Sequence, residues 1–134
     1  AIFRASQSAA KVMLSQGSGS IINMSSQMGH VGAPNRTLYC TTKHAVEGLT
    51  KALGVELAPN GIRVNAVAPT FIDTPMTRPM FENPEFKKTV VNNIALGHVG
   101  TIEDVAAAVL FLASPAAAMI TGESLKVDGG WTAW

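Results

Sequence analysis

The sequence predicts an α/β fold in which helices cover both faces of a parallel sheet. Three short apolar runs, at residues 20–24, 62–68 and 123–127, have the length and composition of buried strands. Helical stretches precede and separate them, and strands that alternate with helices are typical of parallel sheets. Such a thin sheet would have an exposed edge, so we expect these strands to belong to a larger parent sheet.

Three helices accompany the predicted strands. Residues 1–16 repeat apolar side chains at helical spacing, and Gly17 follows where a C-cap belongs. No cap precedes this helix, so we expect the chain to open inside a helix of a longer protein. Residues 37–58 form a longer helix, whose apolar stripe consists of Val46, Leu49, Leu53 and Leu57. The third helix, over residues 101–113, begins with a capping box in which Asp104 replaces the commoner glutamate.

Residues 71–100 are the least regular part of the chain. Three prolines, Pro75, Pro79 and Pro84, divide this segment into short pieces. The pieces leave room for two small helices. Loops on a rigid scaffold often carry specificity. We therefore expect residues 71–100 to form a substrate-binding loop or flap.

Composition limits the classes of function. The chain has 134 residues, 47% hydrophobic and 14% charged, which indicates burial against further chain or other subunits. A formal charge of +1 without a basic run gives no reason to expect nucleic acid. The most apolar stretch, residues 105–113, is too short to span a membrane, so we expect a buried helix and no membrane partner. Cys40 is the only cysteine, which fits a cytoplasmic location, and the scattered histidines predict no metal site.

Tyr39 and Lys43 open the long predicted helix as Tyr-x-x-x-Lys. Four residues make just over one turn, so both side chains share a helical face. An ammonium group near a phenol favours the phenolate, and such a tyrosine can exchange a proton with a substrate oxygen near neutral pH. By itself this spacing also fits an exposed helical tyrosine and lysine.

Ser25 and Ser26 follow the first predicted strand. In open α/β sheets, ligands bind beyond the carboxyl ends of the strands. A serine hydroxyl there can donate a hydrogen bond to a carbonyl oxygen as that oxygen gains negative charge. For two neighbouring serines alone, a turn is the simpler interpretation.

Together these residues closely resemble the core of the short-chain dehydrogenase/reductase family. Residues 21–26 are followed by Gly29 and by Tyr-x-x-x-Lys, and Ser26 precedes Tyr39 by 13 positions, which fits the family's catalytic serine. Further matches to the family's later strands and connecting segment lie at residues 61–69, 71–76 and 121–130. The resemblance covers essentially the whole chain, and its motifs are jointly very specific.

The resemblance implies a Rossmann-type doubly wound parallel sheet. Residues 1–134 would be the C-terminal portion of that single domain, with about three strands and their flanking helices. It also implies an oxidoreductase that transfers a hydride between NAD or NADP and a secondary alcohol or ketone. In this reaction Tyr39 would be the general acid/base, Lys43 would support it and bind the nicotinamide ribose, and Ser26 would polarise the substrate oxygen.

The family's motifs assign further site residues by position. The catalytic set is Ser26, Tyr39 and Lys43, with Ser25 in a structural role. The expected cofactor contacts are Tyr39, Lys43, Pro69, Thr70, Ile72 and Thr74. The expected substrate contacts are Ser26, Gln27, Met28, Tyr39 and Met76. Thr70 stands where the family usually has glycine.

Several family features have no counterpart in residues 1–134. These are the glycine-rich turn, the residue that selects NAD or NADP, the Asn-Asn-Ala-Gly stretch and the catalytic asparagine. We therefore expect the nucleotide-binding half to be missing and this segment alone to be inactive, although the parent protein is an enzyme. The alternative is a non-catalytic binding or regulatory module with the same fold, and the intact serine, tyrosine and lysine set favours the enzyme.

The resemblance also suggests a homo-oligomer. We expect a tetramer assembled through the helix over residues 37–58 and through the last strand and C-terminus, where Trp131 and Trp134 lie. Arg63 and Asn65 are expected to bond their strand to nearby loops. Met76, Met80 and Phe81 could line a substrate pocket or close the core, and the sequence favours neither interpretation.

Overall fold

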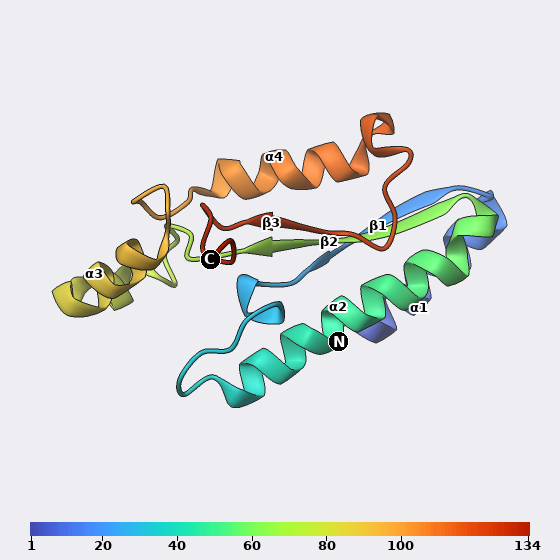
Figure 1. Ribbon diagram of the computed structural model, residues 1–134. Coiled ribbons are helices and arrows are strands. Elements are labelled where there is room, and N and C mark those ends of the chain that lie inside the picture. The colour runs from blue at the N-terminus through green and yellow to red at the C-terminus, as the bar shows by residue number, and fades with distance from the viewer.

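The computed structural model describes residues 1–134 and contains one parallel sheet (Figure 1). Its strands are β1 (Gly19–Met24), β2 (Ile62–Pro69) and β3 (Ser124–Val127), in the spatial order β1-β2-β3. Both neighbouring pairs are parallel, so each connection crosses over the sheet. The predicted α/β class and the three parallel strands are confirmed.

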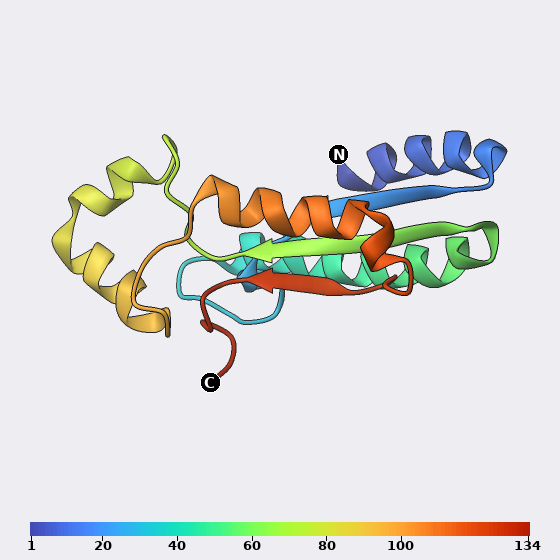
Figure 2. The ribbon, with the colours of Figure 1, turned by 90° about the horizontal axis from the view of Figure 1, so that it is seen from above.

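Helices lie on both faces of the sheet (Figures 1 and 2). One face is covered by α1 (Ile2–Gln16) and α2 (Thr37–Leu57), and the other by α4 (Ile102–Ala113). The remaining helix, α3 (Pro84–Asn93), lies beyond the carboxyl ends of the strands (Figure 2). The three long helices agree with the predicted ranges to within one residue at most ends.

The α1/α2 face has an apolar core with polar bonds running through it. The core consists of Ala10, Ile21, Leu57, Ile62 and Val64. Asn23 of β1 accepts a bond from Ser6 of α1 at 3.2 Å and donates one to Thr50 of α2 at 3.0 Å. The buried side of α2 therefore includes polar residues that its predicted apolar stripe leaves out.

The α4 face is apolar throughout its core. Val67 of β2, Leu112 of α4 and Ala117 are its fully buried members. The prediction of a buried helix over residues 105–113 is wrong, because Leu110 is 71% exposed and Phe111 41% exposed. The helix packs on the sheet through one stripe, and nothing within this chain covers its outer side. No helix has the length and apolar character needed to cross a membrane.

Residues 71–100 form an excursion whose two ends meet. The NH of Asp73 donates to the carbonyl of Gly100 at 2.8 Å, and the NH of Gly100 donates to Phe71 at 3.1 Å. The excursion contains a 3-10 helix over Arg78–Glu82 and then α3, as the positions of the prolines predict. Its aromatic residues Phe71, Phe81 and Phe86 pack against one another, and Phe71 also packs against Trp131 near the C-terminus.

Two local predictions about termini and loops are confirmed. Thr101 and Asp104 form the capping box of α4, in which the Asp104 carboxylate accepts the Thr101 NH at 2.7 Å. Arg63 donates to the carbonyl of Leu112 at 2.8 Å, and Asn65 donates to Ile120 at 2.8 Å. Arg63 also donates to the carbonyl of Ser114 at 3.3 Å, so these bonds attach the middle strand to the C-terminal end of α4 and to the segment that leads into β3.

Candidate active site

The carboxyl ends of β1 and β2 and the first turn of α2 surround a pocket of about 310 Å³. All five expected substrate contacts line it, and two of them belong to the expected catalytic set. Its lining consists of Ser26, Gln27, Met28, Arg36, Tyr39, Thr70, Phe71, Met76, Thr77 and Met80. The fold thus brings residues from four separate parts of the chain to one opening.

Ser26 is held by the turn that ends β1. It is 5% exposed and extended, and it caps a short 3-10 helix over Gln27–Gly29. Its hydroxyl oxygen accepts the NH of Met28 at 3.2 Å, and its proton is donated to the Gln27 side chain at 2.8 Å. A hydroxyl has one donor, so Ser26 must turn its proton away from Gln27 to polarise a substrate oxygen.

Tyr39 and Lys43 lie one turn apart on α2. The Lys43 ammonium nitrogen is 5.6 Å from the centroid of the Tyr39 ring, and it donates to the carbonyl of Met24 at 3.0 Å. Tyr39 is 44% exposed, so its ring is open to a bound molecule. Since an ammonium group has three donors, Lys43 keeps two for another partner. Lys43 itself does not line the pocket.

Thr70 is distinctive among the expected cofactor contacts. Its backbone NH donates to Val127 at 3.1 Å, but its buried side-chain oxygen has no hydrogen-bond partner. A buried polar group without a partner is costly in free energy, which marks this hydroxyl as a candidate ligand contact.

The other expected cofactor contacts lie outside the pocket lining. Pro69 ends β2, and Ile72 pairs with Gly100 at the base of the 71–100 excursion. The Thr74 hydroxyl is 3.0 Å from that of Thr77. The structure therefore brings Tyr39 and Thr70 together in the pocket and leaves the remaining positions along its flank.

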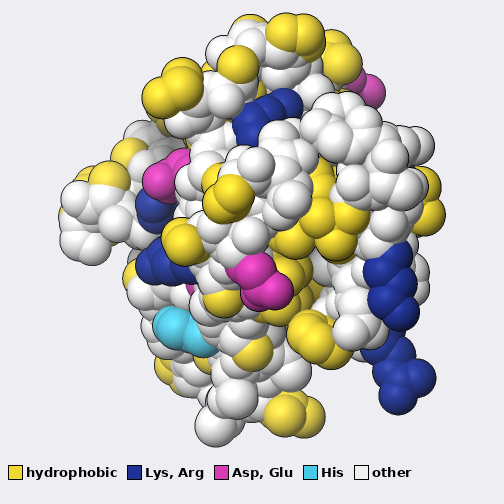
Figure 3. Space-filling model, turned by 90° about the vertical axis from the view of Figure 1, so that its right-hand side faces the viewer, with side chains coloured by type: hydrophobic (Ala, Val, Ile, Leu, Met, Phe, Trp, Pro, Cys, Tyr) yellow, Lys and Arg dark blue, Asp and Glu magenta, His cyan; other side chains and the backbone are white.

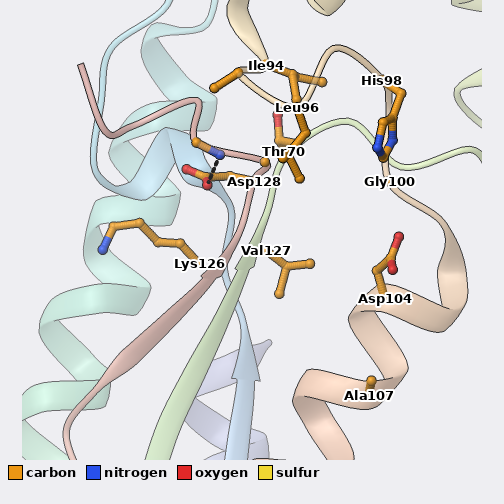
Figure 4. Close-up of a pocket in the computed structure, with 13 residues that line it drawn as sticks. Thr70, Ile94, Leu96, His98, Gly100, Asp104, Ala107, Lys126, Val127 and Asp128 are labelled. Atoms are coloured by element: carbon orange, nitrogen blue, oxygen red, sulfur yellow. Dashed lines mark hydrogen bonds between the residues drawn. The ribbon is translucent and has the colours of Figure 1, made fainter.

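A second pocket, of about 630 Å³, lies beyond the ends of β2 and β3 and shares Thr70 with the first (Figure 4). Its carboxylates are already bonded: Asp104 within the capping box, and Asp128 to Gly130 and Thr132. Burial opposes ionisation of Asp128, but the bonds from Thr132 and Gly130 outweigh it and keep the pKa of Asp128 below its ordinary value.

Sequence reasoning missed the buried carboxylate of Glu47. This side chain is 6% exposed and lies one turn beyond Lys43 on the same side of α2. It accepts bonds from the hydroxyls of Ser25 and Ser124 (the latter at 3.1 Å), and the His30 ring nitrogen is 3.3 Å away. The sequence offered one signal for Glu47, because it lies four residues after Lys43 and therefore on the same side of the helix, next to the apolar Val46.

Glu47 supports the turn that carries Ser26. A Cβ on Gly29 would come within 2.9 Å of the Ser25 hydroxyl and 3.0 Å of Glu47, so only glycine lets the turn approach α2 this closely. The Lys43–Met24 and Glu47–Ser25 bonds attach α2 to two consecutive residues just before Ser26. The Ser25 hydroxyl therefore joins this turn to α2, which is consistent with the structural role that the resemblance implies.

Comparison with known proteins defines the class. The sequence model of a family described as Enoyl-(Acyl carrier protein) reductase matches residues 1–132. L-xylulose reductase of Mus musculus is 43% identical over 134 residues, which are 99% of this chain and 55% of that protein. The chain therefore belongs to the short-chain dehydrogenase/reductase family.

Solved structures agree with the sheet and helix arrangement. A gluconate 5-dehydrogenase from Burkholderia cenocepacia J2315, in complex with NADP and tartrate, has a TM-score of 0.95 and 32% identity over 99% of this chain and 52% of its own. A 4-hydroxyisoleucine dehydrogenase complexed with NADH has a TM-score of 0.94 and 34% identity over 98% of this chain and 55% of its own. The chain spans about half the length of these relatives.

Proposed function

We propose that the protein carrying this chain transfers a hydride between NAD or NADP and a secondary alcohol or ketone. The observation that carries the proposal is that Ser26 and Tyr39 line one pocket while the Lys43 ammonium lies 5.6 Å from the Tyr39 ring. Relatives named as a sugar reductase and as NADP- or NADH-bound dehydrogenases support the reaction class.

The residues around the pocket fit a nicotinamide cofactor. The partnerless Thr70 hydroxyl offers a buried hydrogen-bonding atom, and Lys43 has two donors left for ribose hydroxyls. Tyr39, Lys43, Pro69, Thr70, Ile72 and Thr74 are the residues that would hold the nicotinamide end. When bound, the cofactor supplies the hydride or accepts it.

The chain's own residues handle the proton and the substrate oxygen. In ketone reduction, the Tyr39 phenol would give its proton to the carbonyl oxygen, and in alcohol oxidation the phenolate would take the hydroxyl proton. The Ser26 hydroxyl would donate to the same oxygen and stabilise its developing charge. The positive charge of Lys43 would favour the phenolate.

We expect residues 1–134 alone to be inactive and the complete protein to be active. Within these residues, no strand is followed by a Gly-x-Gly-x-x-Gly turn that opens a helix, which is the arrangement that binds the pyrophosphate, and the glycines after β3, Gly129 and Gly130, lead into no helix. Residues 71–100 would act as the substrate flap, a role supported by the joined base of the excursion and by Met76 and Met80 in the pocket lining.

We also propose a cytoplasmic homotetramer. Apolar side chains that the chain leaves uncovered support self-association, since Phe3 of α1 is 57% exposed and Val55 of α2 is 77% exposed. Figure 3 shows apolar side chains among polar ones on the end of the molecule away from the predicted site. Trp134 at the C-terminus is 79% exposed. Sedimentation of the complete protein tests this assembly.

The catalytic assignment is tested with Tyr39→Phe in the complete protein. Loss of the phenol proton removes general acid/base catalysis, so we expect kcat to fall roughly 10²- to 10⁴-fold. The assay follows NAD(P)H absorbance with a panel of secondary alcohols and ketones. Lys43→Met should also lose activity, whereas Lys51→Met, an exposed lysine of the same helix, is the matched control. A Tyr39→Phe enzyme with full activity would refute the assignment, and a wild-type protein that binds no NAD(P)H would favour a non-catalytic module.

A further inference from the structure

Arg36 is the only charged side chain in the lining of the 310 Å³ pocket. The two ion pairs of the chain join other residues, His30 to Glu47 and Arg78 to Asp73, so no carboxylate neutralises Arg36. Its one side-chain hydrogen bond reaches the carbonyl of the adjacent Asn35 at 3.4 Å. The guanidinium group therefore has nearly all of its five donors free beside the candidate active site.

We propose that Arg36 binds a carboxylate of the substrate, so that the enzyme acts on a hydroxy acid or keto acid. This inference rests on the proposed function, because it concerns the same pocket. A guanidinium group and a carboxylate form two parallel charge-assisted hydrogen bonds, and the planar geometry of one matches that of the other. Phosphate would carry more negative charge than the single cation of this lining balances.

The position of Arg36 suits a carboxylate close to the reacting carbon. Arg36 is the N-cap residue of α2, and Tyr39 follows three positions later on the same helical face. Three residues advance about 4.5 Å along a helix axis. A small molecule whose oxygen lies between the Ser26 and Tyr39 hydroxyls can therefore place a carboxylate at Arg36.

The rest of the lining does not oppose an anion. The uncharged polar members are Ser26, Gln27, Tyr39, Thr70 and Thr77, and the others are apolar. The first turn of α2 contains no acidic residue, and the side chain of Arg36 does not cap the helix. The positive end of the α2 dipole therefore adds to the charge of Arg36 instead of being neutralised. A volume of about 310 Å³ is at the small end of ligand pockets, as a short acid requires.

Substrate pairs that differ in charge test this inference in the complete protein. D-gluconate is compared with D-sorbitol, and 3-hydroxybutyrate with 2-butanol, with NAD and with NADP. We expect kcat/KM to favour the acid of at least one pair about tenfold or more. Arg36→Gln should raise KM for that acid about 10- to 100-fold and should raise KM for the neutral partner much less. Arg36→Lys keeps the charge but loses the planar guanidinium group, so its KM for the acid should lie between those of the wild type and Arg36→Gln.

Arg4→Gln is the matched control, because it removes an exposed arginine of α1 that lines none of the pocket. An unchanged melting temperature shows that Arg36→Gln is folded. Binding of the same acids is also measured by calorimetry, independently of turnover. Acid binding that needs Arg36 without any turnover would support this inference and overturn the proposed reaction. Acids that neither bind nor react better than their neutral partners, or an acid preference that survives Arg36→Gln, would overturn the inference and leave the proposed reaction intact.

Discussion

The two faces of the sheet are held by different kinds of contact. Beneath α1 and α2, buried polar side chains bond across the layers, with Asn23 joined to Ser6 and Thr50, and Glu47 joined to Ser25 and Ser124. Beneath α4 the buried residues Val67, Leu112 and Ala117 are apolar. On that face the strands bond to the helix only at its C-terminal end, for instance from Arg63 to the carbonyl of Leu112.

This difference matters because hydrogen bonds have direction and apolar contacts do not. The bonded face carries the proposed catalytic residues, Tyr39 and Lys43 on α2 and Ser26 after β1. In the proposed reaction, a small shift of one element would misplace the transferred proton. The apolar face carries no expected catalytic side chain, so volume and shape are sufficient there. Variants on the two faces should therefore differ in how stability and activity change together.

The largest stability effect is expected from Leu112→Ala on the apolar face. Leu112 is 1% exposed, and its removal leaves a cavity against β2. We expect the free energy of unfolding to fall by about 3 kcal/mol, with kcat nearly unchanged in the molecules that remain folded. Urea unfolding and NAD(P)-linked activity of the complete protein measure the two quantities. The exposed Leu110→Ala is the control, and a large fall in kcat of Leu112→Ala would remove the distinction between the faces.

The next effect is expected from Glu47→Leu on the bonded face. The change leaves the Ser25 and Ser124 hydroxyls buried without their acceptor, which should cost about 2 kcal/mol of unfolding free energy. Here kcat should fall as well, because the turn of Ser26 loses its support. Glu47→Gln keeps an acceptor oxygen and should recover part of both losses.

Glu56→Leu is the matched control for Glu47, since it replaces an exposed glutamate of the same helix. Its unfolding free energy should change by less than about 0.5 kcal/mol. If Glu47→Leu lost stability but kept full kcat, the bonded face would be no more important for activity than the apolar one.

A smaller effect is expected from the α4 capping box. Thr101→Ala removes the side-chain oxygen that accepts the NH of Asp104 at 3.3 Å. Loss of such a cap costs about 1 kcal/mol of stability. Thr101→Ser keeps the oxygen and should be nearly neutral in the same urea titration, whereas equal destabilisation by both variants would exclude capping as the cause.

The smallest effect concerns pH. The bond from the Thr101 NH, followed by that from its hydroxyl, lowers the pKa of Asp104 below its ordinary value. Because the pKa of this carboxyl is lower in the folded state, ionised Asp104 contributes to the stability of the fold. That contribution is complete above about pH 4 and is lost as the pH falls through the pKa of the folded state. Asp104→Asn should flatten this part of the stability profile, as measured by thermal melting between about pH 2 and 6. An unchanged profile would contradict the role of the charged cap.

Sequence patterns identified the elements because their signals are local. Gly17, in the left-handed conformation, ends α1, and the capping box of Thr101 and Asp104 begins α4. The resemblance to a family further predicts that Ser26, Tyr39 and Lys43 lie near one another. The order of the motifs along the chain is sufficient to identify these three residues.

Non-local contacts explain what the sequence could not predict. Glu47 bonds to Ser25 and Ser124, which lie 22 and 77 positions away in the sequence. Nothing near Glu47 in the chain indicates those partners. Its burial also conflicts with the usual exposure of glutamate. In the opposite sense, the apolar composition of residues 105–113 predicts burial, but composition does not say whether a neighbour covers the outer side of a helix.

The joined base of residues 71–100 has a consequence for how this protein could change over time. The backbone bonds among Phe71, Asp73 and Gly100 bring the two ends of the excursion together before it contributes Met76 and Met80 to the pocket. A segment with such ends can be lengthened, shortened or exchanged without moving β2 or α4. If residues 71–100 form the substrate flap as proposed, a new substrate preference could arise by replacement of this segment alone, with Ser26, Tyr39 and Lys43 unchanged.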